Sequence, residues 1–92
     1  MNYRVVWRPR LLIALDHTGF YARENGRDAM ALARAAADIE LRLSDEPTEE
    51  GESRAGTERV LIVDPLSVVF EVFESSQTVM IYDAVYHPRQ RL

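Results

Sequence analysis

Two periods of hydrophobic and polar positions divide the first half of the chain. Residues 3–8 alternate apolar and basic side chains, and this period of two predicts a strand that ends at Pro9. Residues 10–24 follow a helical period instead, and Gly26 then supplies a helix stop. A second helix is predicted over residues 28–43, because its apolar positions keep the helical spacing and it is rich in alanine, the strongest helix former.

The second half of the chain has a different pattern. Residues 44–57 hold Pro, Gly and acidic side chains with no apolar side chain larger than Ala, so we expect a solvated loop there. Apolar runs follow, and we predict strands at residues 59–63, 68–73 and 78–86, separated by turns at residues 64–66 and 75–77. Because short turns join antiparallel neighbours, these three strands are expected to form a meander.

Together these elements predict an α+β fold in the order β-α-α-β-β-β. Two helices would pack on one face of a small, mainly antiparallel sheet. The length of 92 residues is enough for one domain and too short for two, so residues 1–92 are expected to form a single domain.

The alternation within the last two strands predicts which side chains face the helices. The aliphatic positions are assigned inward: Val68, Phe70, Val72, Val79, Ile81 and Val85. The opposite face then carries an apolar and aromatic set around Glu71: Val69, Phe73, Met80, Tyr82 and Tyr86. A monomer rarely leaves such a patch bare, so we expect a partner chain, a second copy or nucleotide bases to bind there.

Charge narrows the class of partner. All 11 basic residues are Arg, and the net charge is −4. Five acids lie within residues 45–52, and removing that segment changes the net charge from −4 to +1. The pI of about 5.1 argues against a surface that binds nucleic acid throughout, but it leaves room for a local Arg patch.

The sequence also bounds the compartment and the cofactors. The chain contains no Cys, which excludes disulfides and thiolate zinc sites and suits a reducing cytoplasm. The start of the chain has no signal-peptide pattern and no apolar run reaches the length of a membrane span, so a cytoplasmic protein without a membrane partner is expected. His17 follows Asp16 without a second His at ligand spacing, so neither a metal site nor a cofactor is expected.

The element order and three local stretches resemble the RelE/ParE superfamily of toxin-antitoxin and plasmid-stabilisation toxins. The first stretch is residues 51–54 followed by 59–61, similar to the segment leading into that family's second strand. The second is residues 65–72, similar to its middle-strand signature, and the third is residues 78–89, similar to its last strand with a terminal His and Arg. The resemblance covers nearly the whole chain and implies the fold described above.

The resemblance also implies candidate site residues. Members that cleave mRNA on the ribosome need a base, an acid and positive charge on the phosphate. Here Ser67 stands where the family's middle strand carries Arg, and Phe70 stands where it carries Tyr. The remaining catalytic candidates are Arg59, Glu71, His87 and Arg89. The partner-binding candidates are Val69, Phe73, Met80, Tyr82, Tyr86 and Arg91.

Three of these candidates also have purely structural interpretations. His87 precedes Pro88 at a strand end, where it would be solvated or bonded to backbone. Glu71 fits a solvent-side strand position, and Arg59 fits a flanking position that pairs with a loop carboxylate.

Three functions follow from the residues and the resemblance. The first is the toxin of a type II toxin-antitoxin pair, neutralised by a small cognate antitoxin and acting on ribosome-bound mRNA or on DNA gyrase. The missing middle-strand Arg and the acidic pI disfavour mRNA cleavage, and the ending His87-Pro88-Arg89 is closer to the gyrase-directed branch. The second is a catalytically inactive protein of the same fold, acting as a binding module or homodimer. The third, an independent metal-free nuclease, lacks a dense basic cluster.

Overall fold

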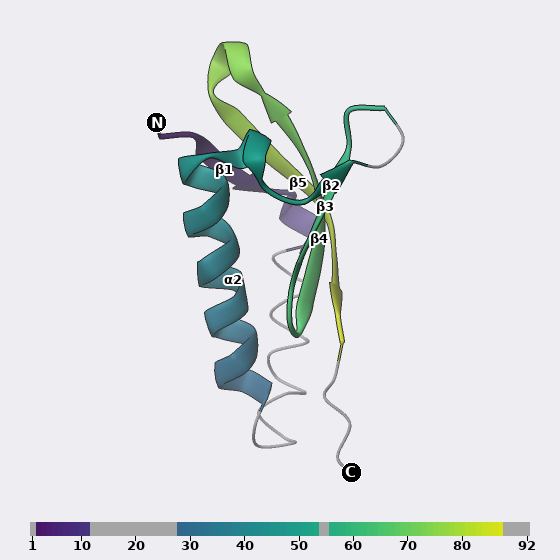
Figure 1. The fold of residues 1–92 in the computed structure, drawn as a ribbon. Helices are drawn as coiled ribbons and strands as arrows, with labels where there is room; N and C mark the ends of the chain where they lie inside the picture. The colour runs from purple at the N-terminus through teal and green to yellow at the C-terminus, as the bar shows by residue number, and fades with distance from the viewer. Residues whose placement is uncertain (1, 12–27, 54–55, 88–92) are drawn as a thin grey trace.

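A five-stranded sheet with the strand order β1-β5-β4-β3-β2 forms the centre of the fold (Figure 1). This is a computed structural model, and it describes residues 2–11, 28–53 and 56–87. The strands are β1 (Arg4–Trp7), β2 (Glu52–Ser53), β3 (Arg59–Val63), β4 (Leu66–Phe73) and β5 (Thr78–Tyr86). β1 runs parallel to β5, whereas β2 to β5 pair antiparallel in the order β2-β3-β4-β5.

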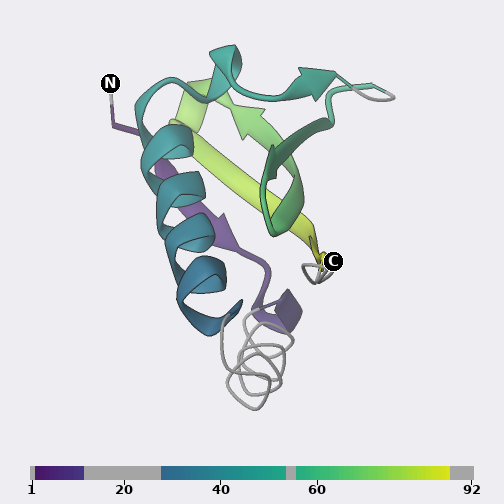
Figure 2. The same cartoon turned by 60° about the horizontal axis from the view of Figure 1, so that its bottom comes forward.

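One helix, α2 (Asp28–Asp45), lies against one face of this sheet (Figures 1 and 2). Leu32, Ala35, Ile39 and Leu43 recur at three- and four-residue spacing, so they form one buried stripe. The stripe packs into a core whose other buried members are Trp7, Leu11, Leu61, Leu66, Val68, Phe70, Val79 and Ile81. The core therefore lies between α2 and the helix-side face of the sheet.

The sequence predicted most of these elements. The α+β class is confirmed, and β3 and β5 have the predicted bounds. β4 begins at Leu66, two residues earlier than predicted, because Leu66 is fully buried and pairs with Val63 across the turn. The first predicted helix falls mostly on residues 12–27, outside the described residues, and residues 9–11 are helical.

The described residues of segment 44–57 are mostly exposed, as predicted, but much of the segment is not an irregular loop. α2 continues to Asp45, a 3-10 turn η1 (Pro47–Glu49) follows, and β2 then pairs with the start of β3. Pro47 is fully buried and supplies the apolar anchor that the segment seemed to lack. An acidic composition therefore did not prevent this segment from packing.

The predicted facing of β5 was wrong in its second half. Val69 pairs with Asp83 and Phe70 pairs with Ile81, so Tyr82 is an extra residue in β5 at this point. Such a bulge reverses the alternation of the residues that follow it. Tyr86, predicted on the outer face, therefore packs against the core, and Val85, predicted inward, is 47% exposed.

No helix within the described ranges is long and apolar enough to cross a membrane.

Candidate binding face

The sheet face turned away from α2, here called the open face, carries a row of side chains across three strands. Ile62 of β3 lies opposite Ser67 of β4, and Ser67 lies opposite Val85 of β5. Directly paired residues project to the same side with Cβ atoms about 5 Å apart, so this row is contiguous. A second row, Val60-Val69-Asp83, runs beside it.

Large apolar side chains are exposed on this face. Ile62 is 70% exposed, and Phe73, at the end of β4, is 40% exposed. With Val85, they make up three of the five exposed large hydrophobic residues found in the described part of the chain. Ile62 and Val85 lie on either side of Ser67, whereas Phe73 lies six residues, or roughly 20 Å, further along β4. Exposed apolar residues on one face mark a candidate interaction surface.

Three polar side chains form a connected group further along the open face. The Tyr82 hydroxyl donates to Glu71 Oε1 at 3.0 Å, and the Thr57 hydroxyl donates to Glu71 Oε2. Burial raises the pKa of Tyr82 above its usual value of 10.0, and the hydrogen bond and charge of Glu71 raise it further. Both oxygens of Glu71 therefore accept from neutral hydroxyl groups that stay protonated near neutral pH.

A pH titration of the tyrosine absorbance should detect the hydrogen bond between Tyr82 and Glu71. The pKa of Tyr82 is raised in the fold, so its stabilising contribution is fully present below about pH 10 and lost as the pH rises through the folded pKa. Absorbance at 295 nm should show one phenol titrating above its ordinary range. Glu71→Gln should lower that pKa, and Tyr82→Phe should remove the transition. An unchanged titration curve in Glu71→Gln would contradict the contact.

A second polar pair sits at the other end of the face. Ser67 Oγ and His87 Nε2 are 2.8 Å apart, and the His87 backbone amide donates to the Pro65 carbonyl at 2.7 Å. Ser67 and Glu71 are four residues apart on β4, so at 3.3 Å per residue they are separated by roughly 13 Å. His87 and Glu71 therefore do not meet at one phosphate group.

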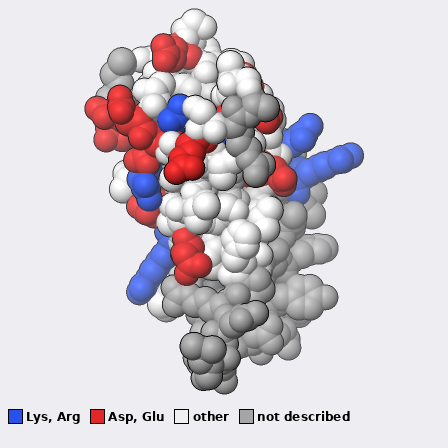
Figure 3. Space-filling view, turned by 45° about the vertical axis from the view of Figure 1, so that its right-hand side comes forward, with Lys and Arg blue, Asp and Glu red and all other residues white. Residues whose placement is uncertain are grey.

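A shallow hollow of about 540 Å³ lies where β1 ends beside β5. It is lined by Arg8, Arg10, Leu11, Glu58, Val69, Tyr82 and Asp83. Two guanidinium groups and two carboxylates share its wall, so the hollow has no strong net charge. Figure 3 brings the side opposite α2 forward; its described surface has many uncharged side chains, acidic groups that gather at the upper left and are scattered over the middle, and most Arg side chains near the borders.

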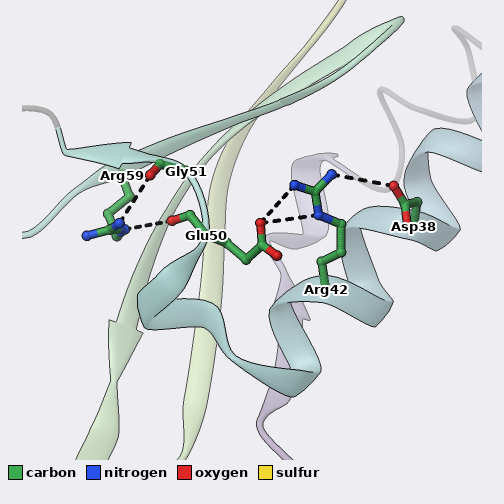
Figure 4. A network of polar contacts seen from close by, with 5 residues as sticks. All are labelled: Asp38, Arg42, Glu50, Gly51 and Arg59. Atoms are coloured by element: carbon green, nitrogen blue, oxygen red, sulfur yellow. Dashed lines mark hydrogen bonds and ion pairs between the residues drawn. The ribbon is translucent and has the colours of Figure 1, made fainter.

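Arg59 belongs to a different part of the molecule. It lies opposite the buried Phe70, hence on the helix side of the sheet. Its guanidinium donates to the backbone carbonyls of Glu50 at 2.8 Å and Gly51 at 3.1 Å (Figure 4). The predicted flanking position is correct, but the partner is loop backbone and not a loop carboxylate.

The Glu50 side chain continues this network towards α2. Glu50 Oε2 accepts from Arg42 at 2.8 Å, and Arg42 also lies 3.6 Å from Asp38 (Figure 4). The hydrogen bond to Glu50 is the main reason that the pKa of Arg42 is raised. Arg59 and Arg42 together attach the segment before β2 to both the sheet and the helix.

Replacing Arg59 with Ala should therefore lower stability. Charge-assisted hydrogen bonds to two carbonyls would be lost, at a cost of about 2 kcal/mol in the free energy of unfolding. Arg8→Ala removes an exposed guanidinium at the end of β1 and should change stability by less than about 0.5 kcal/mol. Urea denaturation of both variants checks this, and equal stabilities would contradict the role assigned to Arg59.

The structure separates the predicted catalytic residues. Glu71 lies in the middle of the open face, His87 beyond its end and Arg59 on the other side of the sheet, while Arg89 lies outside the described residues. Among the predicted partner-binding residues, Val69, Phe73, Met80 and Tyr82 share the open face with Glu71; Tyr86 packs against the core, and Arg91 lies outside the described residues.

Sequence reasoning missed two exposed residues of the face, Ile62 and Val85. The exposure of Ile62 could have been predicted from the alternation in β3. The exposure of Val85 could not, because the bulge in β5 reverses the alternation there. Thr57 was also missed, since its contact with Glu71 spans 14 residues. Within the described ranges, no group of three or more potential metal ligands occurs.

Comparison with known proteins identifies the fold. No protein-family model and no curated protein matches the sequence. Among solved structures, the chain is similar to one in the crystal structure of the toxin-antitoxin complex RelBE2 from Mycobacterium tuberculosis, with a TM-score of 0.70. The similarity covers 95% of this chain and 93% of that chain at 14% sequence identity. The chain thus has the RelE-like fold that the sequence resemblance implied.

Proposed function

We propose that this chain is the toxin of a type II toxin-antitoxin pair of the plasmid-stabilisation kind, and that it stops growth by binding a protein target through the open face. A cognate antitoxin would neutralise it. The proposal is supported by the RelE-like fold, since the similar solved chain comes from a toxin-antitoxin complex. The observation that carries it is the pair of exposed aliphatic side chains, Ile62 and Val85, on either side of Ser67 on the open face.

The geometry favours binding over RNA cleavage. Ser67 provides no positive charge where the resemblance implies Arg, and Arg59 is held by loop carbonyls on the other side of the sheet. Glu71 and His87 stand too far apart to act as the base and acid of one cleavage step. An apolar face without a cationic centre suits a protein partner better than a phosphate backbone.

The target proposed first is DNA gyrase, with a ribosomal protein surface as the alternative. Both are cytoplasmic, in line with the cytoplasmic location expected from the sequence. A small antitoxin would neutralise the chain by covering the face that the target needs.

Induced expression in a bacterial host tests the proposal. Growth should stop after induction and resume when a small antitoxin, encoded beside the gene, is produced. The control is Phe70→Asp, which places a charge in the fully buried core and should prevent folding and toxicity together. Unimpaired growth with the folded wild-type chain would contradict the proposal and favour an inactive binding module.

A further inference from the structure

A second apolar surface lies on the side of α2 that faces away from the sheet. Met30, Ala33, Ala37 and Leu41 follow one another at three- and four-residue spacing and are all exposed. Met30 is 65% exposed and Leu41 is 70% exposed, and they are the other two large hydrophobic residues exposed in the described ranges. Figure 2 shows no described element beyond this side of α2. We call these four residues the outer stripe.

Charged residues flank the outer stripe on both sides: Arg34 and Asp38 lie on one flank, and Glu40, which accepts a hydrogen bond from Trp7 at 2.6 Å, lies on the other. At 100° per residue, Arg34 and Asp38 lie on the same flank, and Leu41 leans towards it. Asp38 makes a 3.6 Å contact with Arg42 that leaves its side chain 48% exposed. Arg34 is exposed as well.

A hollow of about 520 Å³ adjoins the same flank. It is lined by Met30, Ala31, Arg34, Ala35, Asp38, Val63 and Asp64, between α2 and the turn after β3. Leu41 protrudes roughly 16 Å further along the helix, eleven residues from Met30. The same helix surface thus presents a protruding side chain and a recess.

These features fit a second copy related by a two-fold axis. A two-fold axis that runs between two α2 helices, perpendicular to them and level with the midpoint between Met30 and Leu41, makes the helices antiparallel and places each Leu41 beside the partner's hollow. The flank of one copy that carries Arg34 and Asp38 then faces the same flank of the second copy. Arg34 lies opposite Asp38 of the second copy, with an offset of about 1.5 Å along the helix axis. Ala33 and Ala37 allow the helix backbones to approach closely.

A parallel pair does not offer this match. It would place the Arg34 and Asp38 flank of one copy against Ala33 and Glu40 of the other, and each Leu41 against another Leu41. Charge and shape therefore select the antiparallel arrangement.

We propose that this chain forms an antiparallel homodimer through the outer stripe of α2. The interface is distinct from the open face and independent of the proposed toxin function. A single helix pair buries less than the roughly 1,200 Å² typical of tight complexes, so we expect micromolar affinity. Sedimentation velocity of the full chain from about 1 µM to 1 mM should show a monomer–dimer equilibrium.

Matched aspartate variants locate the interface. Leu41→Asp should weaken dimerisation by at least about tenfold, because it removes the apolar side chain and buries a further carboxylate beside a hollow that already holds Asp38 and Asp64 against a single Arg34. Ile62→Asp introduces the same charge at an equally exposed position on the open face and should leave the dimer intact. Dimer loss in Ile62→Asp but not in Leu41→Asp would overturn the proposal.

Charge reversal tests the ion pair. Arg34→Asp should weaken the dimer, and the double variant Arg34→Asp with Asp38→Arg should restore it, because each copy again offers opposite charges at the two positions. A monomer at every concentration in the wild type, or a double variant as weak as Arg34→Asp, would contradict the proposal.

Disulfide cross-linking tests the relative orientation of the two α2 helices. Because the chain has no native Cys, only the introduced cysteines can form the cross-link. In the antiparallel pair, the two copies of residue 37 lie with Cα atoms roughly 6 Å apart, within disulfide range, whereas the two copies of residue 41 are roughly 16 Å apart along the axis. Ala37→Cys should therefore cross-link to itself and Leu41→Cys should not. The reverse result would indicate a parallel pair or another partner for α2 and would overturn the proposal.

Discussion

Replacing Ile62 with aspartate is expected to abolish growth arrest while leaving the fold intact. Ile62 is 70% exposed, so the carboxylate remains hydrated in the free protein. In a complex formed through the open face, the carboxylate would be buried between Val85 and side chains of the target. An unpaired charge at such a site should weaken target binding by about 100-fold or more. Viable counts after induction measure the effect.

The matched control for this experiment is Thr48→Asp. Thr48 is also exposed, but it lies in the 3-10 turn after α2 and away from both apolar surfaces. It should retain the arrest. If Ile62→Asp is folded and as toxic as the wild type, the open face is not the target-binding surface.

Replacing Gly51 with alanine should cause the largest loss of stability from any single methyl group in the described segments. Gly51 has a φ of +73°, and an added Cβ would lie 2.5 Å from the Val60 carbonyl oxygen and 3.2 Å from the Phe70 ring. The neighbouring atoms are backbone and buried core, and Arg59 holds the Gly51 carbonyl in place. We expect a cost of roughly 2–4 kcal/mol in the free energy of unfolding.

Gly56 provides an internal control for this substitution. Its φ of +67° is similar, but an added Cβ would meet nothing within 4 Å. Gly56→Ala should therefore cost only the conformational penalty, about 1 kcal/mol. The difference between the urea unfolding midpoints of Gly51→Ala and Gly56→Ala measures the destabilisation caused by the steric clash at residue 51. Equal midpoints would contradict that clash.

The predictions from sequence succeeded where the structure follows a short repeat of apolar and polar positions. β3, β5 and α2 were found because alternation and helical spacing are visible within ten residues or so. The alternation in β3 also places Ile62 on the face opposite the core, beside Ser67, although Ile62 was not among the predicted partner-binding residues.

The failures share a different physical cause. The bulge at Tyr82 depends on how β5 pairs with β4, and a pairing register is not visible in one strand alone. The ordered structure of the segment before β2 was missed because its attachment relies on Arg59 and Arg42, which lie eight or nine residues away from their partners. The resemblance suggested a catalytic set, but only the three-dimensional arrangement showed that its described members stand apart.

The central proposal is that this chain acts by binding a protein target rather than by cleaving RNA. His87 is the only described catalytic candidate with an imidazole side chain, the commonest general acid or base, so a cleavage mechanism on the open face would depend on it. His87→Ala removes the imidazole from an exposed position and should preserve the fold. The most direct test is the viable count of a bacterial host after induction of wild-type and His87→Ala chains at equal protein levels. The binding account predicts equal growth arrest, whereas loss of arrest in a folded His87→Ala chain, together with mRNA cleavage by the wild type, would contradict it.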